Sequence, residues 1–276
     1  MKKNPSITMI ESFQPYSRAQ MRYLKQNYPK YEYIFLSDKS NGNRVYLPSW
    51  MPQLLILPGG PINKKIFLSC GDEIKKYALS GGNIMAVCSA NYMMTEYSIT
   101  ETIRGRYKLL QSGCSTKLFG GATVYLKTKN SDMPQVKYAF DRDDNKIACL
   151  YYNGPYISGM RLTKPAEYEE CEPILRTKIK NNKLANNELF VMVRKKLPGG
   201  GNLVLSTCHC DHSFASELDF AGKIADGESE PEAAHKHSHT NYLSRIARLA
   251  DKINKTESKM QAVRNYVYED IFGLER

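Results

Sequence analysis

The sequence lacks an apolar run long enough to cross a membrane. A spanning helix needs roughly 20 mainly apolar residues, and the apolar runs of this 276-residue chain are much shorter. The first residues, MKKNPSITMI, contain two lysines but not the apolar segment that follows such lysines in a signal peptide. We therefore expect a cytoplasmic protein with no membrane span.

Cysteine is present without a disulfide framework. The seven cysteines are odd in number and show no repeating spacing, which favours reduced thiols over a disulfide scaffold. Internal repeats are also missing. The overall composition, 42% hydrophobic and 24% charged, is ordinary for a globular protein with a buried core.

The chain is basic but shows no nucleic-acid-binding motif. The formal charge of +11 is compatible with an acidic partner. However, the lysines and arginines are dispersed in ones and twos, and the 19 tyrosines do not gather between them as base-stacking residues would. We expect a solvated basic surface and no nucleic-acid partner. A protein that works through its charge on nucleic acid or a membrane surface is the less favoured alternative.

Short apolar runs alternate with helical patterns in the first half of the chain. Strands are predicted within 6–12, 31–37, 53–61 and 83–88, and helices over 17–28, over 66–79 and from Ser89 onward. Such alternation predicts an α/β fold, with a mostly parallel sheet and helices on both of its faces. Between 121 and 212, segments rich in β-branched and aromatic residues predict added β-strands.

The predicted domain organisation has three parts. Residues 1–225 form the α/β domain, and the polar residues 226–241 form a linker or loop. Residues 242–276 resume helical spacing, with Leu243 and Ile246 near their start. We expect these amphipathic C-terminal helices to cover the core, because an apolar stripe usually faces its own domain. Docking of a protein partner on these helices is the alternative.

The segment GGNIMAVCSANYM, residues 81–93, places Cys88 where an apolar run gives way to small and polar residues. A strand that turns directly into a helix exposes the side chain at the bend and aims the amides of the new helix at the same point. Those amides favour the thiolate, which is the nucleophilic form of cysteine, and they can also hold an oxyanion. We therefore predict a nucleophile at Cys88, while a small core thiol remains the simpler alternative.

His209 is the histidine best placed to act as a base. Three of the five histidines lie in the polar segment 226–241. His209 instead follows the apolar run NLVLST, so it should emerge at the edge where open α/β sheets bind ligands and where Cys88 also emerges. Asp211 lies two residues further on and would point the same way in extended backbone. Cys88, His209 and Asp211 are thus a candidate nucleophile, base and orienting carboxylate.

Four segments occur in the order seen in class I glutamine amidotransferase-like proteins, namely LLILPGGP, GGNIMAVCSANYMMTEY, ACLYYNGPYISG and NLVLSTCHCDH. From Ser6 to Ser213 the chain most resembles the amidotransferase-like domain at the N-terminus of biotin–protein ligases. The resemblance implies a flavodoxin-like sheet with Cys88 as nucleophile. It also implies that Gly59 and Gly60 of the PGG turn supply an amide to the oxyanion.

The sequence departs from the superfamily pattern at three places. In the superfamily, glycines usually flank the cysteine at the sharp strand-to-helix turn. Ala86 and Ala90 stand at these positions here, and alanine adopts the backbone conformations of a tight turn less readily than glycine. Asp211 stands in place of the glutamate that ends the usual His-x-Glu motif. We also expect no biotin-ligase catalytic domain after this region, because the residues that follow His212 are too few for one.

Five further residues are predicted to line the site. Two of them lie outside the turn at Cys88: Glu11 ends the first strand, and Asn153 belongs to the YYNG segment. For Glu11 an exposed surface charge is the simpler alternative. The other three follow the nucleophile directly: Ser89, whose amide would help to hold the oxyanion, Asn91 and Tyr92.

The segment CHCDH, residues 208–212, also contains metal-ligand types. Cys-x-Cys without a second pair at structural-zinc spacing is weak evidence, and strand alternation would turn Cys208 and Cys210 away from His209. We expect neither a metal nor an organic cofactor. The first functional hypothesis is a cysteine-dependent amide hydrolase or amidotransferase-like enzyme acting on a small-molecule or peptide amide. The second is a catalytically inactive binding or regulatory module that keeps the fold.

Overall fold

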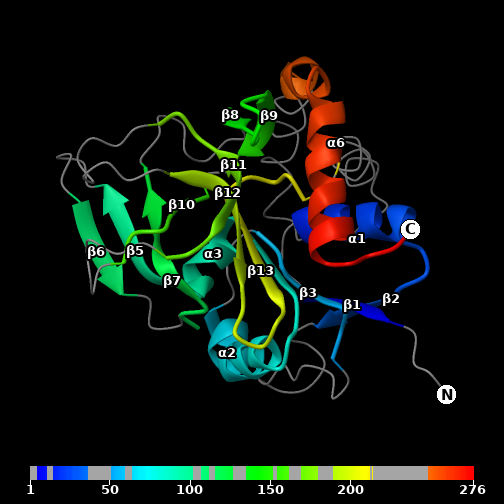
Figure 1. Cartoon of the computed structure of the whole chain (residues 1–276), viewed down its shortest axis with the longest axis vertical. Coiled ribbons are helices and arrows are strands. Elements are labelled where there is room, and N and C mark those ends of the chain that lie inside the picture. The colour runs from blue at the N-terminus through cyan, green and yellow to red at the C-terminus, as the bar shows by residue number, and fades with distance from the viewer. Residues whose placement is uncertain are drawn as a thin grey trace, which may run out of the picture.

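The computed structural model describes residues 5–10, 15–36, 51–59, 64–101, 107–111, 116–126, 135–151, 154–161, 169–179, 189–211, 213 and 248–276 (Figure 1). The strands are β1 (Ser6–Ile10), β2 (Glu32–Leu36), β3 (Leu54–Leu57), β4 (Ile84–Val87), β5 (Thr95–Glu101), β6 (Tyr107–Gln111), β7 (Phe119–Tyr125), β8 (Gln135–Phe140), β9 (Lys146–Tyr151), β10 (Tyr156–Ser158), β11 (Glu172–Arg176), β12 (Phe190–Lys196) and β13 (Asn202–Ser206). The helices are α1 (Pro15–Asn27), α2 (Lys64–Leu79), the short 3-10 helix η1 (Cys88–Ala90), α3 (Asn91–Met94), α6 (Glu257–Asn265) and the π-helix η4 (Tyr266–Ile271). Residues 248–254 are also helical.

The strands form one sheet in the order β2-β1-β3-β4-β13-β12-β10-β7-β5-β6, with β8, β9 and β11 off this path. The first five strands are parallel neighbours, because β1 pairs with β2 and β3, and β4 pairs with β3 and β13. β12 then pairs antiparallel with β13 and with β10. The prediction of a mixed α/β fold with a large sheet is confirmed.

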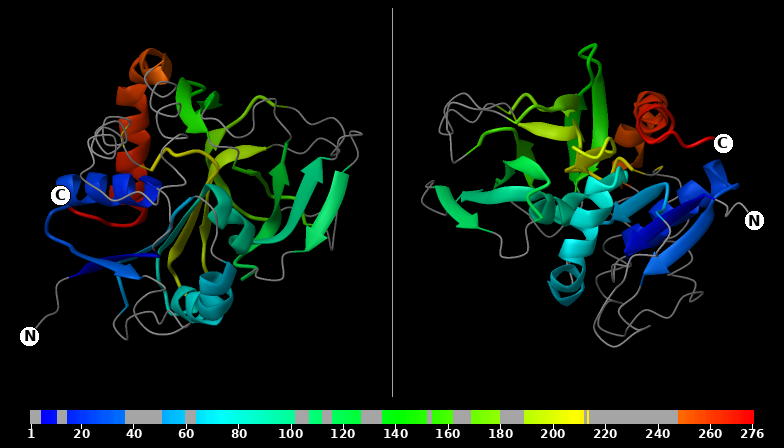
Figure 2. Two further views of the ribbon diagram at one scale, coloured as in Figure 1. Left: turned by 180° about the vertical axis from the view of Figure 1, so that it is seen from behind. Right: turned by 60° about the horizontal axis from the view of Figure 1, so that its bottom comes forward.

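Alternate side chains of the parallel strands enter two separate cores. Leu54 and Ile56 of β3 belong to a cluster that includes side chains of α1, α6 and η4. Leu55 and Leu57 of the same strand belong to a second cluster that includes side chains of α2. Because successive strand side chains point to opposite faces, an uninterrupted apolar strand requires cover on both sides. Figures 1 and 2 show α1 and α6 on one face of the parallel strands and α2 on the other.

The segment after Cys88 is a shorter helix than the sequence predicts. η1 and α3 end at Met94, and β5 begins at Thr95. The sequence of β5, TEYSITE, is rich in β-branched and aromatic residues, which favour a strand. In α1 the helix begins at Pro15, two residues before the predicted start at Ser17. Proline suits the first helical position because its missing N–H would have no partner there.

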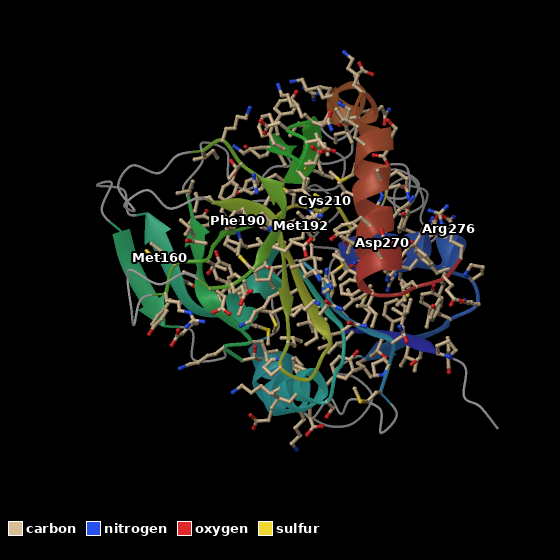
Figure 3. The ribbon with its side chains drawn as sticks, viewed as in Figure 1. Met160, Phe190, Met192, Cys210, Asp270 and Arg276 are labelled. Atoms are coloured by element: carbon tan, nitrogen blue, oxygen red, sulfur yellow. The ribbon has the colours of Figure 1, made fainter. Side chains whose placement is uncertain are left out.

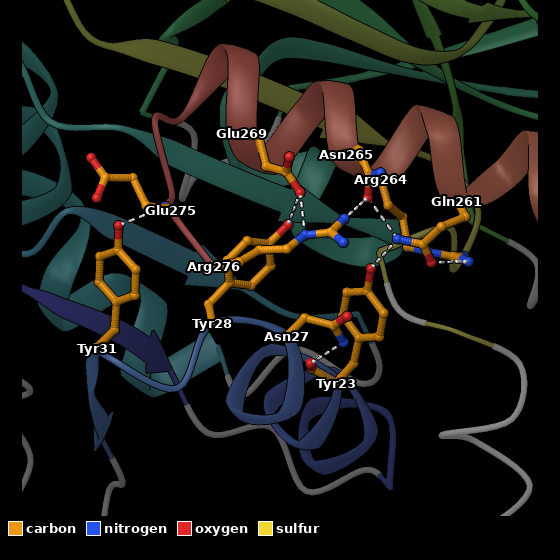
Figure 4. A network of polar contacts seen from close by, with 10 residues as sticks. All are labelled: Tyr23, Asn27, Tyr28, Tyr31, Gln261, Arg264, Asn265, Glu269, Glu275 and Arg276. Atoms are coloured by element: carbon orange, nitrogen blue, oxygen red, sulfur yellow. Dashed lines mark hydrogen bonds and ion pairs between the residues drawn. The ribbon is translucent and has the colours of Figure 1, made fainter.

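The C-terminal residues pack against α1 (Figure 4). Val267 and Phe272 lie in the core cluster that contains Leu24 of α1. Gln261 Nε2 donates a hydrogen bond to Tyr23 Oη at 2.9 Å, which joins α6 to α1 at the surface of this cluster. A six-residue π-helix such as η4 is uncommon, and π-helical turns occur frequently at functional sites.

The segment 226–241, together with Leu243 and Ile246, lies outside the described residues. The division of the chain into an α/β domain, a linker and C-terminal helices therefore stays a prediction. Within the described part of the chain, no helix combines the length and the apolar character that crossing a bilayer requires.

Candidate functional site

Three neighbouring strands deliver the main candidate residues to one edge of the sheet. Gly59 lies two residues after β3, Cys88 directly follows β4, and His209 lies three residues after β13. β3 and β13 both pair in parallel with β4. The carboxyl ends of three adjacent parallel strands therefore meet around Cys88, at the kind of edge where open α/β sheets bind ligands.

The backbone of Cys88 is left-handed. Val87 is extended, with φ −119° and ψ 138°, whereas Cys88 has a φ of 53°. A non-glycine residue in this region costs roughly 1–3 kcal/mol, and such strain collects at functional sites. Ala86 and Ala90 are fully buried on either side of the bend, so alanine fits where the superfamily usually has glycine. The chain thus turns from strand to helix at Cys88, as the sequence predicts.

Gly59 lies between the cysteine and the imidazole. A Cβ on Gly59 would lie 2.8 Å from Cys88 Cβ, 2.8 Å from His209 Cε1 and 3.0 Å from His209 Nε2. Separations this short are below the van der Waals contact of carbon atoms. Cys88 and the Nε2 edge of His209 therefore both lie against Gly59, and they can approach it this closely because residue 59 has no side chain.

Gly154, which is not among the predicted site residues, also lies against Cys88. A Cβ on Gly154 would lie 3.0 Å from Cys88 Sγ and 2.4 Å from the carbonyl oxygen of Thr207. Tyr151 Oη donates to the Gly154 carbonyl at 2.9 Å and so fixes this stretch of backbone. The signal available in the sequence was the glycine of the YYNG segment, one of the pieces that carry the resemblance.

His209 lies on a bend. Its N–H donates to the carbonyl of Leu150 in β9 at 2.9 Å, in an isolated antiparallel bridge. Cys210 N–H donates to the Cys208 carbonyl at 2.9 Å, which closes a tight turn around His209. β13 already ends at Ser206. The strand therefore does not continue through His209 and Asp211, and strand alternation does not place their side chains on one face.

Asp211 is held by the C-terminal segment. Tyr268 Oη donates to the Asp211 carbonyl oxygen at 2.6 Å, and Gln20 Nε2 donates to Tyr268 Oη at 3.3 Å. Burial raises the pKa of Tyr268, and the charge of Asp211 raises it further. The backbone from His209 to Asp211 is thus tied to β9 at one end and to η4 at the other.

The site is more closed than the sequence predicts. Cys88 and His209 are each 5% exposed, and Asp211 is 2% exposed. The expectation that the bend exposes the cysteine side chain is wrong for this conformation, because the Gly154 backbone lies against Sγ. Burial raises the pKa of Tyr92, and the negative charge of an ionised Cys88 would raise it further, which places that phenol in the surroundings of the thiol.

The remaining predicted site residues divide into two groups. Asn91 is fully buried, and its Nδ2 donates to the Ser206 carbonyl at 2.9 Å, so it ties the segment after Cys88 to β13. Ser89 and Tyr92 are half-buried beside it. The other predicted site residues lie outside the described part of the chain: Glu11, Gly60 and Asn153.

The described residues give no support to a metal centre. Among them, no three His, Cys, Asp or Glu side chains are placed to hold a metal ion. The six cysteines within the described ranges are all thiols. The two cysteines of the CHCDH segment are fully buried and contact a third thiol, Cys149.

Comparison with known proteins places the fold. No protein-family model and no curated protein matches the chain. A solved glutamine amidotransferase from Thermotoga maritima superposes with a TM-score of 0.53 and 12% identity, over 98% of this chain and 99% of its own. The chain has a glutamine amidotransferase-like fold. A second solved glutamine amidotransferase covers 80% of this chain and 95% of its own, at a TM-score of 0.46 and 13% identity. In this amidotransferase-like sheet, Cys88 lies at the carboxyl edge of a central strand.

Proposed function

We propose that the protein is a cysteine-dependent amide hydrolase or amidotransferase that uses Cys88, His209 and Asp211. The observation that carries this proposal is the shared contact with Gly59: the cysteine and the Nε2 edge of the imidazole both lie against this glycine at the carboxyl ends of parallel strands. A thiol beside an imidazole can transfer its proton and become the nucleophile. The left-handed backbone at Cys88 supports the same role.

The proposed reaction proceeds through a thioester. His209 accepts the thiol proton, and Cys88 Sγ attacks the carboxamide carbonyl carbon to give a tetrahedral oxyanion. The backbone amides of Ser89 and Gly60 would hold this oxyanion. The C–N bond then breaks, and His209 returns its proton to the leaving amine. Water or an acceptor amine, deprotonated by His209, releases the acyl group as a carboxylate or a new amide.

His209 must supply most of the stabilisation of the thiolate. η1 and α3 together form only a short helical segment after Cys88, and a helix dipole is weak at that length. The positive imidazolium is then the main partner of the thiolate charge. Asp211 would orient this imidazolium through its carboxylate, which requires that the backbone contacts to Leu150 and Tyr268 hold the turn in place.

The finer family relationships belong to the same proposal. The order β2-β1-β3-β4-β13, with all five strands parallel, corresponds to the 2-1-3-4-5 order of flavodoxin-like sheets. We propose that the domain is flavodoxin-like and related to the amidotransferase-like domain of biotin–protein ligases, with residues 242–276 as a C-terminal addition. A small-molecule or peptide amide is the proposed substrate, and the cytoplasm is the proposed location.

An inactive binding module is the second candidate. The low exposure of Cys88 favours it, because a substrate carbonyl must reach Sγ. In that case the same fold would present its surface to a partner without turnover.

Alkylation of Cys88 separates the two candidates. We expect iodoacetamide to modify Cys88 with a pH midpoint below the free-thiol value of about 8.5, since an imidazolium partner favours the thiolate. Replacing His209 with asparagine should raise the midpoint by about one unit or more. Mass spectrometry of the unfolded, digested protein reads the modification at each cysteine, and the half-exposed Cys171 serves as an internal reference.

The turnover experiment uses ammonia release from a panel of carboxamides, with Cys88→Ser as the blank. Release that disappears in Cys88→Ser supports the hydrolase. A Cys88 midpoint at or above the free-thiol value, unchanged by His209→Asn, together with no release above the blank, would leave only the binding module.

A further inference from the structure

Three thiols outside the proposed catalytic group meet in the core beside it. Cys149 comes from β9, and Cys208 and Cys210 flank His209. Their exposed fractions are 1%, 0% and 1%, and all three belong to one core cluster that also contains Met192 (Figure 3). Side-chain hydrogen bonds join Cys149 to Cys208 and to Cys210, and Cys208 to Cys210.

The backbone explains why these thiols converge. The antiparallel bridge between Leu150 and His209 sets Cys149, the residue before Leu150, opposite Cys210, the residue after His209. The tight turn closed by Cys210 N–H and the Cys208 carbonyl places the imidazole at its apex and brings the two flanking cysteines together. Cys149 then faces both of them from β9.

This arrangement suits a sulfur–sulfur bond better than a metal. Within the described ranges, no three ligand side chains are placed to hold an ion, although the three thiols touch. Cys149 and Cys210 are opposed in the antiparallel register of the Leu150–His209 bridge. Opposed residues of antiparallel strands have Cα atoms about 4.5–5.5 Å apart, inside the spacing of about 4.4–6.8 Å that disulfides require. Cys208 and Cys210, with one residue between them, could join only in a strained ring. Cys149 is therefore the required member of any unstrained pair.

We propose that Cys149 and one of the two cysteines that flank His209 form an oxidation site that closes to a disulfide on reaction with a low-molecular-weight disulfide such as oxidised glutathione. One thiolate of the pair displaces one half of the oxidant as a thiol, giving a mixed disulfide. The second protein thiol then attacks the protein sulfur and releases the other half. Two S–H bonds of the protein are lost, one S–S bond forms, and the two electrons and two protons leave on the two oxidant thiols. The third protein thiol stays reduced.

The fold controls the rate of this reaction. A neighbouring thiol, together with burial, raises the pKa of Cys149 and of Cys210, and burial raises the pKa of Cys208, so the closed structure keeps all three protonated and unreactive. Reaction therefore requires local opening of the Leu150–His209 bridge. Once formed, the disulfide would join the turn that carries His209 covalently to β9. An effect on catalysis follows only if His209 is the proposed base, and that step rests on the proposed function.

The experiment treats the folded full-length protein with oxidised glutathione, blocks remaining thiols with iodoacetamide and digests without reduction. We expect mass spectrometry to find the Cys149 peptide joined to the peptide that contains Cys208 and Cys210, and dithiothreitol to reverse the link. Cys149→Ala should remove the link. Cys70→Ala, which removes an equally buried thiol of α2, should retain it. Stable glutathione adducts on these cysteines, a link between Cys208 and Cys210 alone, or no product while Cys171 reacts would overturn the proposal.

A second measurement does not depend on catalysis or on folding of a variant. Hydrogen exchange of the His209 amide, which donates to Leu150, should slow by about tenfold or more on oxidation of the wild-type protein, because opening of the bridge becomes limited by the link. Unchanged exchange in the linked protein would contradict the proposed locking of the turn. If the link forms and exchange slows while Cys88 shows no enhanced reactivity, the proposed catalytic function fails and the oxidation site stands.

Discussion

Replacing Gly59 with alanine is expected to separate Cys88 from His209 and to destabilise the fold. The new Cβ would lie 2.8 Å from both Cys88 Cβ and His209 Cε1. Cys88 Cβ is attached to a strained backbone at the first residue of η1, directly after β4, so it cannot give way as the end of a flexible side chain could. We expect a loss of about 1–3 kcal/mol in the free energy of unfolding, as for other overpacked sites. The pH midpoint of Cys88 alkylation should rise toward that of a free thiol.

Gly71 provides the matched control. It lies within α2, and a Cβ built there meets nothing within 4 Å. Gly71→Ala should therefore stabilise the protein by about 0.5–1 kcal/mol, the usual gain when alanine replaces glycine inside a helix. Denaturant unfolding gives both free energies. Equal stability of the two variants, with a wild-type alkylation midpoint in Gly59→Ala, would show that Gly59 does not hold the cysteine and the imidazole together.

The convergence of Gly59, Cys88 and His209 could be predicted because each position depends on where a single strand ends, and the end of a strand is visible in the local sequence. Each residue follows a short apolar run, and parallel strands end at one edge of a sheet whatever lies between them in the chain. The spacing of the runs, their alternation with helical patterns and the glycines after the third strand are all visible locally.

The rest of the site depends on contacts that no local pattern encodes. The turn at His209 exists because its N–H pairs with Leu150 of β9, an interaction between remote segments. The same pairing brings Cys149 to Cys210, and nothing in either sequence segment indicates it. The sequence does not predict β5 and β6 for a related reason. The short helix after Cys88 ends at Met94, and the next residues pair with β7 as β5, so strand pairing determines the structure there.

Replacing Tyr268 with alanine is expected to destabilise the whole protein in one transition. Tyr268 is fully buried, and its ring packs against Tyr23 and Tyr28 of the first helical region and against Phe272, with centroids 6.2, 5.8 and 6.4 Å away. Truncation of a large buried aromatic residue typically costs about 3–5 kcal/mol. Leu79→Ala, at a side chain that is 60% exposed, should change the stability by less than about 0.5 kcal/mol.

Tyr268→Phe separates the hydroxyl from the ring. This variant keeps the aromatic packing but removes the hydrogen bond to the Asp211 carbonyl, at an expected cost of about 1–3 kcal/mol for a buried acceptor left without its partner. It should also speed hydrogen exchange around His209, because the turn loses one of its two anchors.

Calorimetry of Tyr268→Ala shows whether the C-terminal residues unfold together with the α/β sheet. A single transition that moves to lower temperature in Tyr268→Ala means that the C-terminal residues fold with the α/β sheet, because the ring lies in the core that α1 and the parallel strands share. A separate low-temperature transition, with the main one unchanged, would make residues 242–276 an independent unit.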